Sequence, residues 1–351
     1  MTMPAFFLEH PLSFTHVTVM PAEVVQALNA QPGGVYVDAT AGGGGHSLAL
    51  LQACPEARVI AFDRDPMAVE AARARLTEFG ERATVVHAAF DGIARELAEM
   101  RLASIDGLIA DLGISSEQLA RGDRGMSFRL EGPIDMRMDP TSGETARELI
   151  ERVSQDELAD VLFQMGEERR SRRVARCIKQ ALEAGELETT VDLRRAVVRA
   201  VGPRRVGGID PATRTFQALR VAVNGELDQL AGLLAMAREL VRPGGAVAFI
   251  SFHSLEDRLV KRALVDRSVW QRQSNKPVLP GEAEQAQNPR ARSAKLRAAL
   301  RVENTEGESD EPESDRGEAL NWYGARGARG ENAGENAEFH SDAALLEGGS
   351  A

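Results

Sequence analysis

The stretch Val35-Tyr-Val-Asp-Ala-Thr-Ala-Gly-Gly-Gly-Gly-His-Ser47 decides the fold. An apolar run ends at Asp38, a run of glycines ends at Gly45, and a segment of helical character follows at Ser47–Ala53. This order of strand, glycine loop and helix is typical of the start of a βα unit. Glycines at a helix N-terminus let the backbone pass close to a ligand, although a tight turn without a ligand has the same composition.

Further apolar runs continue this pattern along the chain. Strands are predicted at Arg58–Phe62, Thr84–His87 and Ile105–Ala110. A helix is predicted at Met67–Leu76, after an N-cap at Asp65 and a proline in the first turn. Strands that alternate with helices at this spacing predict an α/β fold with a parallel, doubly wound sheet.

The alternation stops after Asp111 for roughly 100 residues. Within this interval, residues 146–184 and 191–201 are predicted to be helical. A long helix at 215–240 and a strand at 246–251, joined by a Pro-Gly-Gly turn, then return to the pattern of the sheet.

The sequence therefore predicts three parts. Residues 1–115 and 213–302 form a discontinuous sheet domain, and residues 116–212 form an inserted, mainly helical domain for substrate recognition. Residues 303–351 carry a net charge of −10 out of the chain's −11, which leaves the remainder near −1. The acidic composition of this last part, poor in β-branched residues, predicts a disordered tail.

Composition argues against several classes of protein. No apolar run approaches the roughly 18 residues that a membrane span needs, and the first residues lack the basic start of an export signal. The two cysteines, Cys54 and Cys177, lie far apart in the sequence, which argues against a disulfide framework and a zinc site with CxxC spacing but leaves a single pairing open. We expect a cytoplasmic protein that binds neither a metal nor a membrane.

Asp63 ends the second predicted strand, about 20 residues after the glycine loop, where an acidic side chain can bind both hydroxyls of a ribose. The two features together indicate an adenosine-containing cofactor. The glycines are continuous rather than spaced as in a dinucleotide fingerprint, and Asp38 would repel a pyrophosphate but can hold a methionine ammonium. These details favour S-adenosylmethionine, with a nicotinamide oxidoreductase as the alternative.

Five longer stretches are too unusual to belong to a generic sheet protein. They are Asp111-Leu-Gly-Ile-Ser-Ser-Glu-Gln118, Arg124-Gly-Met-Ser-Phe128, Gly132-Pro-Ile-Asp-Met-Arg-Met-Asp139, Pro211-Ala-Thr-Arg-Thr-Phe-Gln-Ala-Leu-Arg220 and Ile250-Ser-Phe-His-Ser-Leu-Glu-Asp-Arg258. Together they resemble the MraW, or RsmH, family, and the likeness extends from about His16 to Arg301. The resemblance implies a class I (Rossmann-like) S-adenosylmethionine-dependent methyltransferase that acts on the N4 amino group of a cytosine in 16S ribosomal RNA.

The resemblance also implies seven cofactor contacts. They are Gly44, Gly45, His46, Asp63, Phe90, Asp111 and Gln118. The residues themselves favour Asp63 as the ribose ligand, whereas Phe90 covers adenine or belongs to the core, and His46 contacts the cofactor or caps the helix. Gln118 depends on the resemblance alone.

Methyl transfer to an exocyclic amine is an in-line displacement, so alignment of donor and acceptor is its main requirement. An acceptor for the amino N–H groups also localises the nitrogen lone pair and takes the released proton. Asp111, at the end of its strand, is a candidate for this catalytic role or holds the methionine part of the cofactor. Ser251 and His253 are candidates for positioning the base, with packing and capping as the alternative.

The expected partner is the 16S ribosomal RNA of the small subunit. The candidates for RNA binding are Arg137, Arg290, Arg292 and Lys295. A further run of arginines within 169–176 has helical spacing and forms either a phosphate-binding surface or a solvated helix face.

Other functions and the oligomeric state stay open. A non-catalytic RNA-binding factor would have kept the sheet but lost methyl transfer, and the intact glycine loop with Asp63 argues against it. A DNA amino-methyltransferase is disfavoured because the chain lacks an Asn/Asp-Pro-Pro-Tyr/Phe segment. The sequence also leaves a homodimer open.

Overall fold

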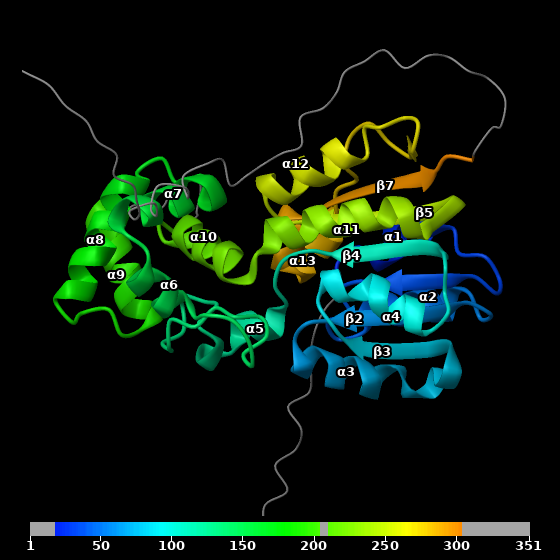
Figure 1. Ribbon diagram of the computed structural model, residues 1–351, viewed down its shortest axis with the longest axis horizontal. Coiled ribbons are helices and arrows are strands. Elements are labelled where there is room, and N and C mark those ends of the chain that lie inside the picture. Colours follow the sequence, from blue (N-terminus) through cyan, green and yellow to red (C-terminus); the bar gives the residue numbers. More distant parts are fainter. Residues whose placement is uncertain (1–17, 204–209, 304–351) are drawn as a thin grey trace, which may run out of the picture. The chain divides into compact units, whose positions relative to one another are not determined.

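The structure is a computed structural model that describes residues 18–203 and 210–303. Within these residues one sheet has the strand order β3-β2-β1-β4-β5-β7-β6 (Figure 1). The strands are β1 (Val35–Asp38), β2 (Arg58–Asp63), β3 (Ala83–His87), β4 (Ile105–Asp111), β5 (Val241–Ser251), β6 (Trp270–Arg272) and β7 (Lys295–Arg301). The predicted acidic tail lies outside the described residues, apart from Glu303.

The pairing of the strands brings three carboxylates to one edge of the sheet. Strands β3, β2, β1, β4 and β5 are parallel, and β7 is antiparallel to both β5 and β6. The strand order reverses between β1 and β4, and ligands of doubly wound sheets bind at such a switch point. Asp38, Asp63 and Asp111 are the last residues of β1, β2 and β4. The predicted α/β fold is confirmed.

Helices cover both faces of the sheet. They are α1 (Pro21–Leu28), α2 (Gly45–Ala53), α3 (Pro66–Leu76), α4 (Ile93–Glu99), α11 (Glu226–Leu240) and α12 (Ser254–Ala263); a further short helix, α13 (Glu282–Gln287), has no buried residue. Successive residues of a strand point to opposite faces, so Tyr36 packs with α1, α2 and α3 in one core, and Val37 packs with α4, α11 and α12 in another.

A third apolar core lies among the helices that interrupt the sheet. These helices are α5 (Ser116–Ala120), α6 (Ala146–Arg152), α7 (Gln155–Gly166), α8 (Ser171–Glu183), α9 (Thr190–Val201) and α10 (Thr213–Asn224). Leu162, Ile178 and Val197 are fully buried in this core, and Figure 1 shows α6 to α9 grouped at the left of the view. All described residues nevertheless fall into one compact unit, so the division at residues 116 and 212 remains a prediction.

Two of the long predicted helices are divided in the structure. The stretch 146–184, predicted to be helical, contains α6, α7 and α8, because the Ser154 capping box starts α7 and Glu167, with a φ of +51°, ends it. The predicted helix at 215–240 is divided at Gly225, which has a φ of +58°. The helical character of both stretches is confirmed, but an unbroken helix at 215–240 was wrong, because local caps and breaks override a continuous apolar period.

Strands β6 and β7 were not predicted. In β7 the buried Leu296 and Ala298 alternate with Lys295 and Arg297, whose charges obscure the strand pattern in the sequence. Arg297 Nε donates to Asp257 Oδ1 at 2.7 Å, so a neighbouring carboxylate accommodates this charge beside the sheet. Among the described helices, none combines the length and apolar character needed to span a membrane.

Candidate active site

A pocket lies at the carboxyl edge of the sheet, beside the switch point. Its volume is about 960 Å³ when the part open to solvent is included, and residues from the glycine loop and from the ends of β2 and β4 line it. The pocket lining includes six of the seven predicted cofactor contacts: Gly45, His46, Asp63, Phe90, Asp111 and Gln118. Gly44 does not line it.

Close packing shapes the glycine loop. Gly44 precedes α2 with a φ of +76°, and a Cβ there would lie 3.3 Å from the Cα of Ala72. A Cβ at Gly45 would lie 1.7 Å from Thr18 Oγ1. A larger residue at Gly44 or Gly45 would therefore strain or displace the backbone. The loop leaves its backbone exposed to the pocket because it has no side chains.

Asp38 lies outside the pocket lining and holds the base of this loop. Its fully buried carboxylate accepts hydrogen bonds from Ser47 Oγ at 2.7 Å and from the backbone N–H of Thr40 at 3.1 Å. Burial raises the pKa of Asp38 above its ordinary value. The contacts of Asp38 are thus with the loop itself.

Asp63 connects the glycine loop with the start of α3. Its Oδ2 accepts from the Gly42 N–H at 2.8 Å, and its Oδ1 accepts from the Asp65 N–H at 2.9 Å. Burial is the largest cause that raises the pKa of Asp63, to about 6. Asp63 therefore presents its carboxyl group to the pocket, where a ribose ligand is expected.

Phe90 and Gln118 reach the pocket from different segments. Phe90 begins a short 3-10 turn after β3 and also packs against the core that contains α4. Gln118 is buried on α5, where its Nε2 donates to Asp65 Oδ2 at 2.8 Å and its Oε1 accepts from the Ser115 N–H at 2.9 Å. Protein contacts thus fix the orientation of Gln118 in the pocket wall.

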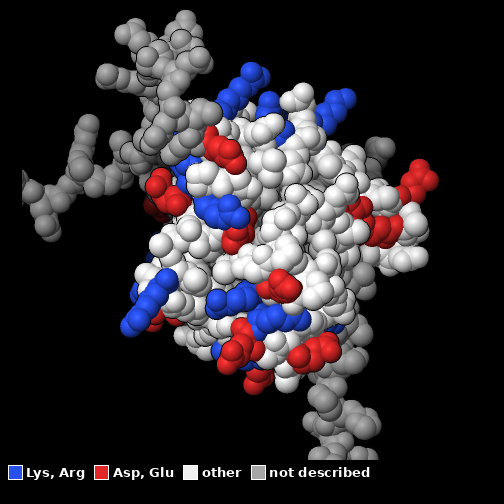
Figure 2. Space-filling model, turned by 90° about the vertical axis from the view of Figure 1, so that its right-hand side faces the viewer, with Lys and Arg blue, Asp and Glu red and all other residues white. Residues whose placement is uncertain are grey.

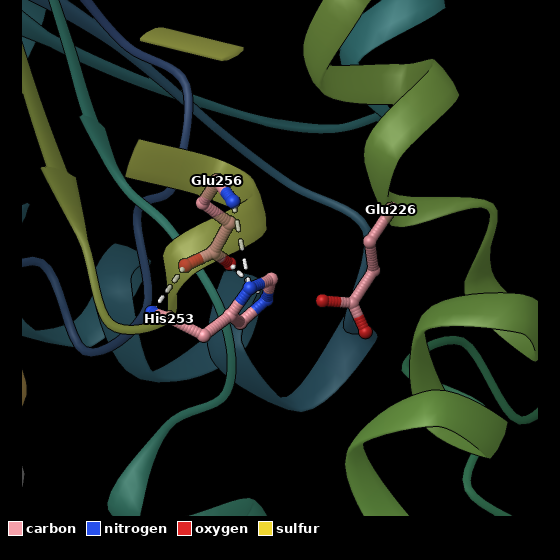
Figure 3. Close-up of side chains that lie close together, drawn as sticks. All are labelled: Glu226, His253 and Glu256. Carbon is pink, nitrogen blue, oxygen red and sulfur yellow. Dashed lines mark hydrogen bonds and ion pairs between the residues drawn. The ribbon is translucent and has the colours of Figure 1, made fainter. Parts of the chain in front are cut away.

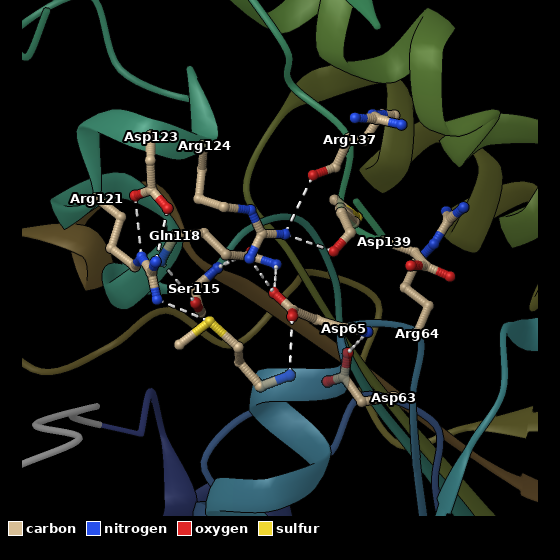
Figure 4. Close-up of polar contacts among 12 residues, drawn as sticks. Asp63, Arg64, Asp65, Ser115, Gln118, Arg121, Asp123, Arg124, Arg137 and Asp139 are labelled. Atoms are coloured by element: carbon tan, nitrogen blue, oxygen red, sulfur yellow. Dashed lines mark hydrogen bonds and ion pairs between the residues drawn. The ribbon is translucent and has the colours of Figure 1, made fainter. Parts of the chain in front are cut away.

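A buried ion pair joins this wall to the segment before α6 (Figure 4). Arg124 Nη1 lies 3.0 Å from Asp65 Oδ2, and both side chains are less than a tenth exposed. Arg124 Nη2 also donates to the carbonyls of Arg137 and Met138, at 3.1 and 2.5 Å. Sequence reasoning identified Asp65 only as a helix cap, a role confirmed by its bond from the Met67 N–H.

Asp111 is the acidic residue at the centre of the pocket's polar groups. Its Oδ2 lies 3.9 Å from His46 Nε2 and 3.8 Å from Arg290 Nη2. Its Oδ1 is buried and has no hydrogen-bond partner among the described residues. Its backbone N–H donates to Thr40 Oγ1 at 2.6 Å, which fixes the end of β4. A carboxylate acceptor is therefore held in the pocket with one oxygen unused.

Ser251 and His253 do not line the pocket. Ser251 Oγ donates to the Lys295 carbonyl at 3.5 Å. His253 is the N-cap of α12, where its Nδ1 accepts from the Glu256 N–H at 3.4 Å. Glu256, which sequence reasoning missed, does line the pocket. The observed contacts of Ser251 and His253 are thus those of packing and capping residues, which was the alternative interpretation. A role in positioning the base stays a prediction.

Glu226, His253 and Glu256 form a compact cluster beside the pocket (Figure 3). Their potential ligand atoms lie within 4.8 Å of one another. Both oxygens of Glu226 accept from the buried guanidinium of Arg220, at 2.7 and 2.8 Å, and His253 Nε2 lies 3.1 Å from Glu256 Oε1. A protein cation therefore already balances Glu226.

The predicted RNA-binding residues differ in their surroundings. Arg137 is paired with Asp135 at 2.7 Å, and Lys295 lies 3.5 Å from Asp257. Arg292 is exposed, whereas Arg290 is largely buried and lines the pocket. These four basic residues therefore do not form one exposed surface, and their contact with RNA remains a prediction.

The arginines of α8 are different. Arg169, Arg172, Arg173 and Arg176 are exposed, and none makes an ion pair with another residue in the described ranges. Their spacing places them on one face of the helix and the turn before it. Figure 2 shows the opposite side of the molecule, at the right of Figure 1, where basic and acidic side chains are interspersed.

The sheet order and the pocket together define a class I, S-adenosylmethionine-dependent methyltransferase. The pocket contains groups that suit an adenosyl amino acid: a glycine loop without side chains, the Asp63 carboxylate at the end of β2, and Asp111 Oδ1, an acceptor that has no hydrogen-bond partner among the described residues. A sequence model of the MraW methylase family matches residues 13–302. The chain belongs to this family.

Relatives of this chain are named as methyltransferases of ribosomal RNA. A protein of Sorangium cellulosum (strain So ce56), named ribosomal RNA small subunit methyltransferase H, is 61% identical over 296 residues, which are 84% of this chain and 94% of the relative. A protein of Cyanothece sp. with the same name is 49% identical over 294 residues, covering 84% and 97%.

Solved structures give only remote likenesses. An rRNA methylase from Streptococcus thermophilus aligns with a TM-score of 0.38 and 10% identity, over 85% of this chain and all of the other. A SAM-dependent O-methyltransferase from Thermotoga maritima aligns with a TM-score of 0.38 and 11% identity, over 84% and 69% of the two chains.

Proposed function

We propose that this protein transfers a methyl group from S-adenosylmethionine to the N4 amino group of a cytosine in the 16S ribosomal RNA of the small subunit. The observation that carries the proposal is a pocket that holds Asp63 and the unused Asp111 oxygen together beside the glycine loop. The names of the relatives support the RNA substrate. An enzyme with this substrate acts in the cytoplasm, where ribosomal subunits are made. The proposed reaction does not require a homodimer.

We assign each pocket residue one role in the reaction. S-adenosylmethionine, when bound, supplies an electrophilic methyl group. Asp63 binds the ribose hydroxyls, and Phe90 covers one side of the adenine ring. Asp111 Oδ1 accepts a hydrogen bond from the cytosine amino group, which keeps the nitrogen lone pair available, and then takes the proton that this nitrogen loses. Fixing these groups before the reaction contributes the alignment that transfer requires.

Cells that lack this protein provide the test of the proposed function. We expect mass mapping of their 16S ribosomal RNA to show the loss of one N4-methylcytosine, with other modified nucleosides unchanged. An unchanged N4-methylcytosine content would contradict the proposal.

Calorimetric titration of the purified protein with S-adenosylmethionine and with NAD tests the two alternative functions. A nicotinamide oxidoreductase binds NAD, and a non-catalytic RNA-binding factor need bind neither compound.

Cofactor affinity should depend on the ionisation of Asp63. Because burial raises the pKa of Asp63 to about 6, the fold favours the protonated form, and this contribution to stability is lost as pH rises through about 6. Ribose binding needs the ionised form of Asp63, so cofactor affinity should rise with pH over the range in which this contribution to stability falls. We expect S-adenosylhomocysteine to bind about tenfold more weakly at pH 5 than at pH 7, measured by calorimetry. The Asp63→Asn variant should lack this pH step, and a step of equal size in that variant would assign the titration to another group.

The exposed arginines of α8 should bind RNA phosphates. Replacing Arg172, Arg173 and Arg176 with glutamine is expected to raise the KM for small subunits about tenfold or more, and to reduce the slope of log affinity against log salt by about 2 to 3. Cofactor affinity should not change. The control variant replaces Arg58, the first residue of β2, and Arg267, which precedes β6; both arginines are exposed. Equal salt slopes in the two variants would show that the α8 surface is only solvated.

A further inference from the structure

Arg290 has surroundings unlike those of an arginine that binds the RNA backbone. Its side chain is only 14% exposed, and it lines the pocket. Its guanidinium lies over the ring of Phe252, 4.5 Å from the centroid. The buried Nη1 has no hydrogen-bond partner among the described residues. A guanidinium that is enclosed in this way faces the contents of the pocket.

The negatively charged carboxylate of Asp111 lies directly beside the guanidinium of Arg290. Arg290 Nη2 and Asp111 Oδ2 are 3.8 Å apart, too far for a hydrogen bond but close enough for the charges to attract. Asp111 Oδ1, like Arg290 Nη1, is buried without a partner in the described structure. Buried polar groups are normally paired, and unpaired ones in a pocket are typical of a site whose ligand completes the pairing. The ligand would need a donor and an acceptor on one edge.

Resting on the proposed function, we propose that Arg290 and Asp111 form a donor–acceptor pair that recognises the base edge of the target cytosine. Cytosine presents its N4–H groups as donors beside N3 and O2 as acceptors. Asp111 accepts from N4–H, and Arg290 donates to N3 or O2. Uracil has the reverse pattern at these positions, with O4 against the carboxylate and N3–H against the guanidinium. The pair therefore selects cytosine by rejecting uracil as well as by binding the correct base.

The amino acid part of the cofactor is the rival ligand, since its ammonium suits Asp111 and its carboxylate suits Arg290. A second carboxylate at this end of the pocket favours the base. Glu256 Oε2 accepts from the Phe252 N–H at 2.8 Å, so the Glu256 carboxylate adjoins the residue whose ring lies under Arg290. An incoming carboxylate would meet repulsion from Glu256, whereas the edge of a neutral base would not.

The test compares Arg290→Gln with Arg267→Gln, an exposed arginine outside the pocket. We expect Arg290→Gln to bind S-adenosylhomocysteine within about threefold of the parent affinity, but to methylate small subunits about 100-fold more slowly in a single turnover. RNA hairpins with cytidine or uridine at the target position then serve as competitors. The parent should be inhibited better by the cytidine hairpin, and Arg290→Gln should show a smaller preference for cytidine, because the Asp111 carboxylate still disfavours uracil O4. Arg267→Gln should match the parent in all three measurements.

Each other outcome is decisive. A loss of S-adenosylhomocysteine affinity equal to the loss of rate would assign Arg290 to the cofactor carboxylate and overturn the proposal. A parental rate with an unchanged cytidine preference would also overturn it. If Arg290→Gln melts below the parent, Arg290→Lys replaces it, because lysine keeps the charge but not the planar set of donors, and a reduced cytidine preference is again expected. A parent protein that forms no N4-methylcytosine would instead contradict the proposed function.

Discussion

Replacing Arg124 with methionine is expected to lower the free energy of unfolding by about 3–5 kcal/mol. The substitution keeps the aliphatic volume but removes the guanidinium that lies 3.0 Å from Asp65 Oδ2. Asp65 would remain as a buried carboxylate with only Gln118 Nε2 and the Met67 N–H as donors. Urea unfolding followed by circular dichroism measures the change.

Arg121→Met is the matched control for this loss of stability. Arg121 lies in the same segment and forms an ion pair with Asp123 at 2.6 Å, but its side chain is 37% exposed and that of Asp123 is 58% exposed. Exposed pairs of this kind contribute at most about 1 kcal/mol. Similar losses in Arg124→Met and Arg121→Met would mean that burial of the Arg124 pair contributes nothing, contrary to our account.

Replacing Asp63 with alanine is expected to raise the dissociation constant for S-adenosylhomocysteine about 100-fold. The variant loses the carboxylate that we propose as the ribose ligand, and hydrogen bonds to a charged group contribute about 1.5–3 kcal/mol each. It also releases the N–H groups of Gly42 and Asp65, which loosens the glycine loop. Calorimetry at pH 7.5 measures the affinity, and thermal melting shows that the fold is retained.

The control for Asp63→Ala is Asp91→Asn, an exposed acidic residue that follows Phe90. Its affinity for S-adenosylhomocysteine should stay within about twofold of the parent. If Asp63→Ala bound as tightly as Asp91→Asn, the ribose contact would have to come from another residue, and the assignment of the pocket would be wrong.

The parts of the fold that repeat a local pattern were predictable. Each apolar run that ends in an acidic residue, as at Asp38, Asp63 and Asp111, became a parallel strand with that carboxylate at the functional edge. Local signals also decide where helices restart, and Ser154 and Gly225 could have been recognised as a cap and a break. Strand β7 was harder to predict, because its alternate positions carry charges that only the folded chain pairs with Asp257.

The site was predictable where one strand–loop–helix unit supplies it. Gly45, His46 and Asp63 belong to such units, and their arrival in one pocket follows from the parallel sheet. The position of Arg290 depends on contacts between segments far apart in the sequence, and no local pattern reveals that it lies against Asp111. The burial of Arg124 against Asp65 depends on the same kind of contact.

The most direct test of the central claim is methyl transfer by the purified protein. Small ribosomal subunits that lack this modification are incubated with methyl-labelled S-adenosylmethionine, and the nucleosides of their 16S ribosomal RNA are separated and identified by mass spectrometry. We predict that the label appears in a single N4-methylcytosine for each subunit, and that Asp63→Ala reduces its rate of formation at limiting cofactor. Label at C5, on a ribose or on protein, or no transfer to the subunit, would contradict the account.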